Sequence, residues 1–184
     1  MAALRTDRLL LRQWRESDCE QFATMNSDPV VMEHFPGLMD EQDSERWAQE
    51  IRAQIAQRGW GLWAVELHAG PPFAGFVGLN VPRFMPDAVE VGWRLITEVW
   101  GHGYATEAAG AAVRYGFEEL HLQEIISFTT PANLRSRRVM ERLGMTHDPA
   151  DDFDHPFVDP GPIKRHVLYR LTRERWSKPP APAQ

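Results

Sequence analysis

The chain has 184 residues, of which 43% are hydrophobic and 25% charged, and its formal net charge at pH 7 is −6. This length and mix are typical of one globular domain that buries about seven tenths of its unfolded surface. The acidic balance argues against a nucleic-acid-binding protein, which carries a basic footprint. Cys19 is the only cysteine, so neither an intrachain disulfide nor a cysteine metal cluster is expected.

No apolar run in the sequence approaches the ~20 residues that a membrane span requires. The opening residues, MAALRTDRLLLRQW, are too short and too interrupted by charge for a secretory signal. We therefore expect a cytoplasmic protein with no membrane or nucleic-acid partner and a single domain over residues 1–176. Residues 177–184, which end in KPPAPAQ, are expected to form a disordered proline-rich tail.

The chain opens with a predicted strand and a short helix. Residues 8–14 (RLLLRQW) predict the strand. Ser17 and Glu20 have the spacing of a capping box, which predicts a helix start. Asp28 followed by Pro29 predicts a new helical turn with the aspartate as its N-cap.

A longer helix and a pair of strands follow. Asp40 or Asp43 suits the N-cap of the helix, and Gly59 ends it. Residues 60–67 and 73–80 predict two strands joined by a proline-containing hairpin turn.

The middle of the chain predicts a strand, a glycine-bearing loop and a helix. Apolar residues alternate with others from Val89 to Leu95, which is typical of a strand. Gly101 and Gly103 allow a tight turn, and an apolar stripe of period 3.6 from Ala109 to Leu120 predicts the helix. Because the first N–H groups of a helix are unpaired and carry the positive end of its dipole, this order predicts a phosphate or pyrophosphate site.

The loop does not match the common nucleotide motifs. No Gly-Lys pair follows the glycines, which excludes a P-loop. A dinucleotide fingerprint needs a glycine or alanine where Thr106 stands, and an acidic residue at the end of the next strand. The sequence therefore disfavours a nicotinamide-dependent oxidoreductase. The simplest alternative is that the glycines form only a tight turn between strand and helix, with no ligand.

A second strand and helix complete this unit. Residues 124–129 are β-branched and aromatic, Asn133 suits an N-cap, and Gly144 stands where a glycine ends a helix. The next segment, 147–162, holds four prolines and five aspartates and predicts a loop. Residues 166–172 predict the last strand.

Two motifs in this unit resemble the GNAT superfamily of acyl-CoA-dependent N-acyltransferases. The family's pyrophosphate signature, Q/R-x-x-G-x-G/A, corresponds to Trp100-x-x-Gly103-x-Ala105, with tryptophan replacing the first polar residue. Its later signature, N-x-x-S-x-x-x-x-E-[KR]-x-G-[FM], is matched by Asn133, Ser136, Glu141, Arg142, Gly144 and Met145. The resemblance covers residues 6–172. The tryptophan and the GYATEA that follows are similar to the branch containing bacterial ribosomal-protein alanine N-acetyltransferases.

The resemblance implies a mixed α+β fold, with a central and mostly antiparallel sheet of six to seven strands flanked by about four helices. It implies transfer of an acetyl group from acetyl-CoA to a primary amine in a ternary complex, without a metal. The implied acceptor is a small molecule or a peptide N-terminal α-amine, and small amines, amino acids and amino sugars stay open. A homodimer is compatible with family habit. The rival interpretation is a module that binds acyl-CoA without catalysis.

Such a reaction needs a deprotonated amine, a polarised thioester carbonyl and a proton for the departing thiolate. Glu90, on the strand that enters the glycine loop, is the candidate general base, directly or through a water. Its alternative is a structural glutamate, exposed or paired with an arginine. By resemblance, Ser136 is the candidate proton donor to the thiolate; its alternative is a helix serine that bonds to its own backbone.

The loop and helix start are expected to hold the pyrophosphate through backbone N–H groups. These residues are Gly101, His102, Gly103, Tyr104, Ala105 and Thr106. The backbone of Leu95, Ile96 and Thr97 is expected to pair with the pantetheine arm and to polarise the carbonyl. Asn133 is expected to bond to the same arm, to cap its helix, or both.

Two more groups of side chains are candidates for ligand contacts. Arg137 or Arg138 is expected to meet the 3′-phosphate of CoA, although a solvated helix face is the plainer interpretation. The late loop carries carboxylates that would attract an ammonium substrate, or it is only a hydrophilic surface. Its residues are Asp151, Asp152, Asp154 and His155.

Overall fold

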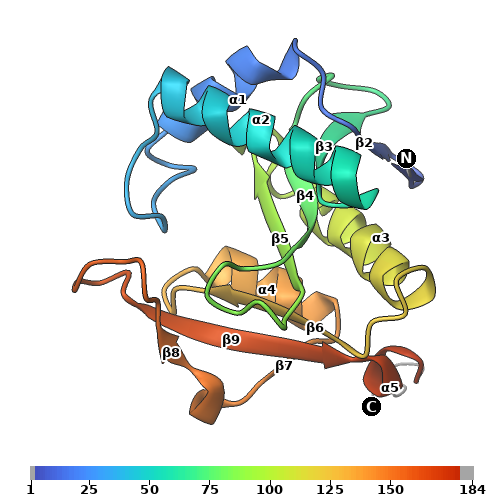
Figure 1. Ribbon diagram of the computed structural model, residues 1–184, viewed down its shortest axis with the longest axis vertical. Helices are drawn as coiled ribbons and strands as arrows, with labels where there is room; N and C mark the ends of the chain where they lie inside the picture. Colours follow the sequence, from blue (N-terminus) through green and yellow to red (C-terminus); the bar gives the residue numbers. More distant parts are fainter. Residues whose placement is uncertain (1–2, 179–184) are drawn as a thin grey trace.

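The computed structural model describes residues 3–178, which form one mixed sheet of nine strands with helices on both faces (Figure 1). The strand order is β1-β2-β3-β4-β5-β6-β9-β7, and β8 also pairs with β9. All pairings are antiparallel except that of β5 with β6, which is parallel. The predicted fold class is therefore confirmed.

The strands are β1 (Leu4–Arg5), β2 (Leu9–Arg12), β3 (Leu62–Leu67), β4 (Gly75–Asn80), β5 (Glu90–Leu95), β6 (Glu124–Thr129), β7 (Thr146–His147), β8 (Phe153–Asp154) and β9 (Arg165–Thr172). The helices are α1 (Asp18–Ser27), α2 (Glu41–Arg58), α3 (Tyr104–Glu118), α4 (Leu134–Arg142) and α5 (Arg173–Trp176), with 3₁₀ turns η1 (Thr97–Val99) and η2 (Pro149–Asp151). Three strands, β1, β7 and β8, have two residues each, too few to show a period in the sequence. Strand β8 lies in the segment 147–162 that composition predicted as a loop, and β7 ends at its first residue, His147.

Of the two helix starts predicted from capping residues, that of α2 is confirmed and that of α1 is not. As predicted, Asp40 is the N-cap of α2, with its carboxylate accepting from the N–H of Asp43 at 2.7 Å, and Gly59 is the C-cap. The capping box predicted for α1 is wrong, because Ser17 makes no side-chain cap hydrogen bond. The buried carboxylate of Asp18 instead pairs with Arg12 at 2.7 Å.

The turn predicted after α1 is present but does not continue into a helix. The Asp28 side chain accepts from the N–H of Val30 at 2.8 Å and its carbonyl from the N–H of Met32 at 3.0 Å, while residues 29–34 remain turns. At the other end of the chain, the predicted tail lies outside the described residues from Pro179 onward. Within residues 3–178, no helix is long and apolar enough to span a membrane.

Helices cover the two faces of the sheet. Helix α2 packs on α1 and β3, and α3 packs on β4 and β5 and against α4. The buried stripe of α3 includes Ala109, Ala112, Val113 and Phe117, as its period predicted. Burying a side chain as large as Phe117 or Trp63 stabilises the fold by about 1.5–3 kcal/mol.

The parallel strands β5 and β6 separate soon after they meet. Their Cα register pairs Glu90 with Ile126, and the N–H of Ile126 donates to the carbonyl of Val89 at 2.9 Å. Beyond this point β5 stays paired with β4, and β6 with β9. The facing edges of residues 91–95 and 127–129 thus open into a gap in the sheet, where the candidate site lies.

Candidate active site

The glycine-bearing loop leads from the end of β5 into α3. Gly101 and Gly103 both adopt a φ of 81°, a left-handed conformation that costs other residues about 1 kcal/mol. Gly103 is the N-cap of α3 and has no side chain with which to cap it. The first N–H groups of α3 therefore remain available to a ligand.

Arg8 and Glu107 hold this loop in place. One carboxylate oxygen of Glu107 accepts from the Thr6 hydroxyl at 2.6 Å, and the other accepts from Nε of Arg8 at 2.6 Å. Nη1 of Arg8 donates to the carbonyl of His102 at 3.0 Å, and its guanidinium lies 4.5 Å from the ring centre of Tyr104. Although burial opposes the shift, these hydrogen bonds lower the pKa of Glu107. Sequence reasoning missed this contact because its partners are 99 residues apart.

Trp100 occupies the position where the family signature has glutamine or arginine. Its indole Nε1 donates to the carbonyl of Leu95 at 2.8 Å, and the guanidinium of Arg135 lies 4.6 Å above its ring. The indole thereby ties the loop to β5 through a hydrogen bond and to α4 through a cation–π contact. Trp100 thus positions the loop through its indole, where the family signature has a polar side chain.

A cavity of about 400 Å³, here called the larger cavity, lies between the glycine loop, β5 and α4. Nine of the predicted site residues line it: Leu95, Gly101, Gly103, Tyr104, Ala105, Thr106, Asn133, Ser136 and Arg138. Arg135 and Arg142, which sequence reasoning had not selected, line it as well. The three guanidinium groups of α4 and a free helix N-terminus are suited to a ligand with several phosphates. The fourth lining arginine, Arg94, is buried on β5 and donates to the Asn26 side chain at 2.6 Å.

The other predicted cofactor contacts lie outside this lining. Ile96, Thr97 and His102 do not line the larger cavity, and the N–H of Ile96 donates to the carbonyl of Ala74 at 3.0 Å. Of the two arginines considered for the 3′-phosphate, Arg138 lines the cavity.

Arg137 is turned to the interior side of α4. Its Nε donates to the Tyr169 hydroxyl at 3.2 Å and its Nη1 to the carbonyl of Pro131 at 3.1 Å. The hydrogen bond to Tyr169 raises the pKa of Arg137. The Arg137 guanidinium therefore has hydrogen-bond partners within the protein and does not need a ligand phosphate.

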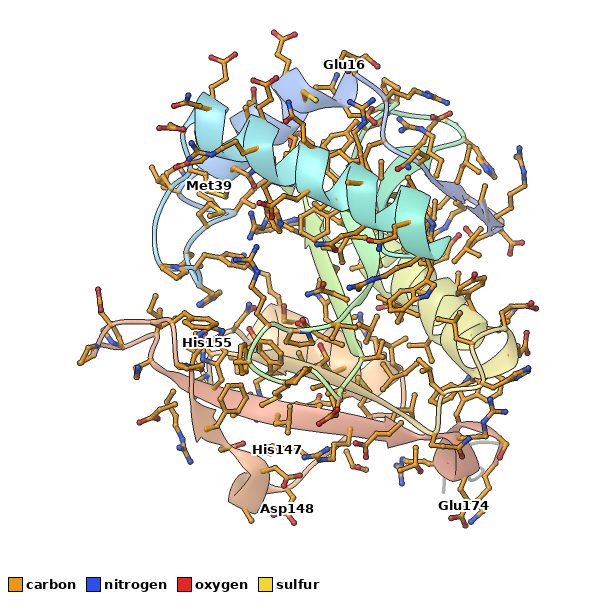
Figure 2. The ribbon with its side chains drawn as sticks, in the orientation of Figure 1. Glu16, Met39, His147, Asp148, His155 and Glu174 are labelled. Carbon is orange, nitrogen blue, oxygen red and sulfur yellow. The ribbon has the colours of Figure 1, made fainter. Side chains whose placement is uncertain are left out.

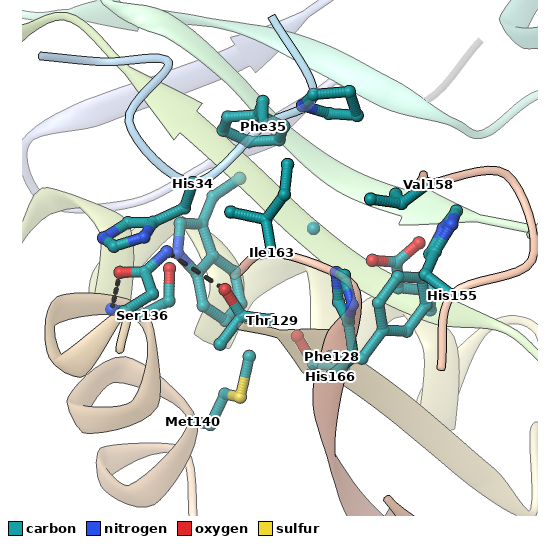
Figure 3. Close-up of a pocket in the computed structure, with 16 residues that line it drawn as sticks. His34, Phe35, Phe128, Thr129, Ser136, Met140, His155, Val158, Ile163 and His166 are labelled. Atoms are coloured by element: carbon teal, nitrogen blue, oxygen red, sulfur yellow. Dashed lines mark hydrogen bonds between the residues drawn. The ribbon is translucent and has the colours of Figure 1, made fainter. Parts of the chain in front are cut away.

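A second cavity of about 180 Å³, here called the smaller cavity, adjoins the first (Figure 3). The residues that line both cavities are His34, Phe35, Trp93, Asn133 and Ser136. Glu90 lines only the smaller cavity, with His155 and His166. Two ligands, one in each cavity, would therefore meet at the shared wall.

Glu90 is half-buried at the point where β5 leaves β6. Burial raises the pKa of Glu90 to about 8, although a hydrogen bond with Asn80 opposes the rise. The alternative of a pairing with arginine is not seen, since no ion pair within residues 3–178 includes Glu90. A carboxylate of this basicity can take a proton from an amine whose own pKa is ~8.

Asn133 and Ser136 form the start of α4. The carbonyl of the Asn133 side chain accepts from the N–H of Ser136 at 3.1 Å, and its amide donates to the Thr129 hydroxyl at 3.0 Å (Figure 3). The predicted N-cap is confirmed. The same contacts place both side chains at the wall between the two cavities.

Three histidines line the smaller cavity, and two of them, His34 and His166, were not selected from the sequence. Figure 3 shows His34 and Ser136 on one side of the cavity and His155 on the other. Nδ1 of His34 lies 3.2 Å from the Thr130 hydroxyl. His34 reaches the site from the segment after α1, and no local motif marks it.

His155 and His166 lie with their ring centres 5.0 Å apart. Nδ1 of His166 is 3.2 Å from the carbonyl of Lys164, which assigns it the proton and leaves Nε2 as an acceptor. Nδ1 of His155 accepts from the N–H of Phe157 at 3.3 Å, which assigns the proton to Nε2. Burial lowers the pKa of both side chains and favours neutral rings.

The aspartates of the late loop do not line the smaller cavity, which favours the plainer interpretation of a hydrophilic surface over an anionic acceptor wall. In Figure 2, His155 lies above β9, towards the middle of the molecule, whereas His147 and Asp148 lie below it. Three of them have partners of their own: Asp151 pairs with Arg170 at 2.7 Å, Asp154 pairs with Arg165 at 3.4 Å, and Asp152 is hydrogen-bonded to Nε2 of His147 at 2.8 Å. Of the predicted wall, only His155 reaches the cavity.

Comparisons with known proteins agree with this geometry. An FsC-acetyl coenzyme A-N(2)-transacetylase from Aspergillus fumigatus is 41% identical over 194 residues, covering 98% of this chain and 80% of that protein. A GNAT-family acetyltransferase structure from Bacillus anthracis has a TM-score of 0.78 at 28% identity, covering 94% of this chain and 99% of that one. RimL, a ribosomal L7/L12 α-N-protein acetyltransferase solved with coenzyme A, shares the fold, with a TM-score of 0.76 at 14% identity over 93% and 98% of the two chains.

Residues 8–146 match the family described as acetyltransferase (GNAT) domain, which is most of the chain. The match contains the strand, the glycine loop and the two helices that form the larger cavity. The chain therefore belongs to the GNAT family and is an acyltransferase.

Proposed function

We propose that the protein transfers the acetyl group of acetyl-CoA to a primary amine by direct attack in a complex that holds both substrates. The observation that carries this proposal is the pair of adjoining cavities with five lining residues in common. A module that only bound acyl-CoA would need the larger cavity alone. The smaller cavity, with Glu90 in its wall, therefore supports catalysis over simple binding.

The larger cavity has the groups that coenzyme A requires. The N–H groups at the start of α3 would hold the pyrophosphate, and Arg138, with Arg135 and Arg142 beside it, would hold the 3′-phosphate. The unpaired edge of β5 and the amide of Asn133 would meet the pantetheine arm. This arrangement directs the thioester towards the wall that both cavities share.

The chemistry follows from the groups at that wall. Glu90 accepts a proton from the ammonium, directly or through a water, and the freed nitrogen attacks the thioester carbon. The C–N bond forms, the tetrahedral intermediate collapses, and the C–S bond breaks. Ser136, which lines both cavities, donates its proton to the departing thiolate and recovers one from the nitrogen, which loses its second proton as the amide forms.

We favour an α-amine as the acceptor, such as the N-terminus of a protein. The pKa of Glu90, raised to about 8, matches an α-amine, with a pKa of ~8, better than a lysine side chain at ~10. The fungal relative is named for transfer to N(2), and RimL for acetylation of a protein α-N. Both names are compatible with this choice.

The test combines a thermal melt with a thiol-release assay. Acetyl-CoA at ~100-fold over its Kd should add about 2.7 kcal/mol of stability, which for a domain of this size raises Tm by roughly 5–10 °C. NAD should leave Tm unchanged. Acetyl-CoA with a primary amine should then release free CoA. No Tm rise would mean that the loop is only a turn, and a rise without thiol release for any amine would indicate a binding module.

A further inference from the structure

The smaller cavity has no permanently charged side chain in its wall. Among the residues that line it there is no aspartate, lysine or arginine, and its only titratable groups are Glu90 and the three histidines His34, His155 and His166. Burial of Glu90 favours its neutral form up to a pKa of about 8, and burial of His155 and His166 favours their neutral rings. Near pH 7 the cavity thus has no fixed anion with which to pair a second cation.

Aromatic rings form one side of this cavity and continue to the surface. The ring centre of Phe128 lies 5.6 Å from that of Phe84 and 5.5 Å from that of Phe153. Phe84 also lies 4.6 Å from His155 and 6.0 Å from Phe157. Phe157 is 68% exposed, so the cluster reaches solvent on the loop between β8 and β9.

Two acids that adjoin the cavity's residues in the sequence lie outside its wall. Glu33 is exposed, with its carboxylate 3.6 Å from Nε2 of His34, and Asp154, which follows Phe153, pairs with Arg165. A substrate with a second ammonium near its amine would bury an unpaired charge here, at a cost in free energy. A polyol would also lose free energy, because some of its hydroxyls would lie against Phe128, Val158 and Ile163, which offer them no hydrogen-bond partner. An aromatic or aliphatic group would instead gain from leaving water.

We propose that the acceptor is a monoamine whose amine is carried on an apolar or aromatic body, and that the smaller cavity discriminates against polyamines and amino sugars. This inference rests on the proposed transfer to an amine. Two imidazoles can bind the polar end of such a monoamine, because Nε2 of His166 is a hydrogen-bond acceptor and Nε2 of His155 is a donor.

Three probes of the full chain separate these classes: phenylalaninamide, lysinamide and glucosamine. The first two carry the same α-amine and differ in the charge of the side chain. Thiol release with saturating acetyl-CoA gives kcat/KM for each. We expect phenylalaninamide to exceed lysinamide by about tenfold or more, with glucosamine lowest, because an unpaired charge or hydroxyl costs at least that factor.

A pair of variants tests whether the smaller cavity sets this preference. Ile163 lines it and is half-buried, so both Ile163→Asp and its uncharged match Ile163→Asn are tolerable. The aspartate places a fixed anion in the wall. It should raise kcat/KM for lysinamide roughly fivefold over the Ile163→Asn variant, since an added charge pair of this kind is worth about 1 kcal/mol. The two variants should differ much less in kcat/KM for phenylalaninamide.

The outcomes separate the substrate class from the transfer reaction. If lysinamide or glucosamine equals or exceeds phenylalaninamide with the wild-type protein, transfer stands and the proposed class is wrong. If Ile163→Asp and Ile163→Asn have equal kcat/KM for lysinamide, the smaller cavity does not set the preference and the proposal is overturned. If acetyl-CoA raises Tm but none of the three probes releases thiol, the proposed class and the proposed transfer are both contradicted.

Discussion

The two cavities of this acetyltransferase are built in different ways. The larger one is formed mainly by two continuous stretches, residues 101–106 and 133–142, and it offers backbone N–H groups and arginines. The smaller one gathers single side chains from distant elements, such as His34 after α1, Glu90 on β5 and His166 on β9. A cofactor site of the first kind can be encoded by a local motif. An acceptor site of the second kind exists only after the sheet has formed.

This difference separates the expected effects of substitutions. Changes at residues that line only the larger cavity should alter acetyl-CoA binding and leave the chemical step and the acceptor preference unchanged. Changes at residues that line only the smaller cavity should alter the chemical step or the acceptor preference and leave acetyl-CoA binding unchanged. Variants that moved both sets of parameters together would contradict the division of labour between the two cavities.

The largest effect is expected for Glu90→Gln. Loss of the general base should lower kcat by about 10²–10³-fold, while KM for acetyl-CoA stays within a factor of two. Because the pKa of Glu90 is raised to about 8, its basic form appears as the pH rises, so wild-type kcat should increase with a midpoint near that value. The variant should lose this inflection, as measured by thiol release with phenylalaninamide between about pH 6 and 9.5, a range that brackets the amine pKa.

Glu118→Gln is the matched control for this measurement. Glu118 is exposed at the end of α3 and lines neither cavity, so its variant should retain both kcat and the pH profile. A Glu90→Gln enzyme with unchanged kcat across the range would remove Glu90 from the mechanism and leave the imidazoles as the candidate bases.

A smaller effect is expected for Arg138→Gln. Loss of a charge-assisted hydrogen bond to phosphate should raise KM for acetyl-CoA by about 10–100-fold, corresponding to 1.5–3 kcal/mol. Acetyl-dephospho-CoA lacks the 3′-phosphate, so the variant and the wild type should bind it alike. Arg114→Gln removes the same charge from an exposed position on α3 outside both cavities and should change neither KM. Equal losses with both cofactor forms would place Arg138 against another part of CoA.

The sequence predicts the residues of the larger cavity better than those of the smaller cavity. Gly101, Gly103 and Asn133 could be selected because their roles depend on backbone conformation within a few residues. His166 could not, because it reaches the cavity through a register in which it pairs with Phe153 of β8, a strand of two residues. No period in the sequence marks so short a strand.

The same limit explains the failed capping box at Ser17. Local spacing favoured a cap there, but the neighbouring Asp18, 2% exposed, binds Arg12 and accepts from the N–H of Arg15 at 2.7 Å. Arg12 in turn reaches Glu66 on β3 at 2.7 Å. A network that joins α1 to the neighbouring strands β2 and β3 thus replaced a local hydrogen bond worth about 1 kcal/mol.

The smallest predicted effects come from two glycines of the α3 region, and they have opposite signs. Gly103→Ala places a Cβ at a φ of 81° and should destabilise the protein by about 1 kcal/mol. Gly110→Ala lies inside α3, where the added Cβ meets only the Leu143 side chain at 3.8 Å, and should stabilise the protein by about 0.5–1 kcal/mol. For a domain of this size each change shifts the ligand-free Tm by roughly 2–4 °C.

Acetyl-CoA then separates the two variants a second time. Gly110→Ala should keep the wild-type rise in Tm on adding acetyl-CoA, because Gly110 does not line the larger cavity. Gly103→Ala should show a smaller rise, because its loop must leave the conformation that directs the first N–H groups of α3 at the pyrophosphate. Both variants should retain the acceptor preference of the wild type. An undiminished rise in Gly103→Ala would mean that side chains, and not the backbone, dominate cofactor binding, and the contrast between the two cavities would then lose its physical basis.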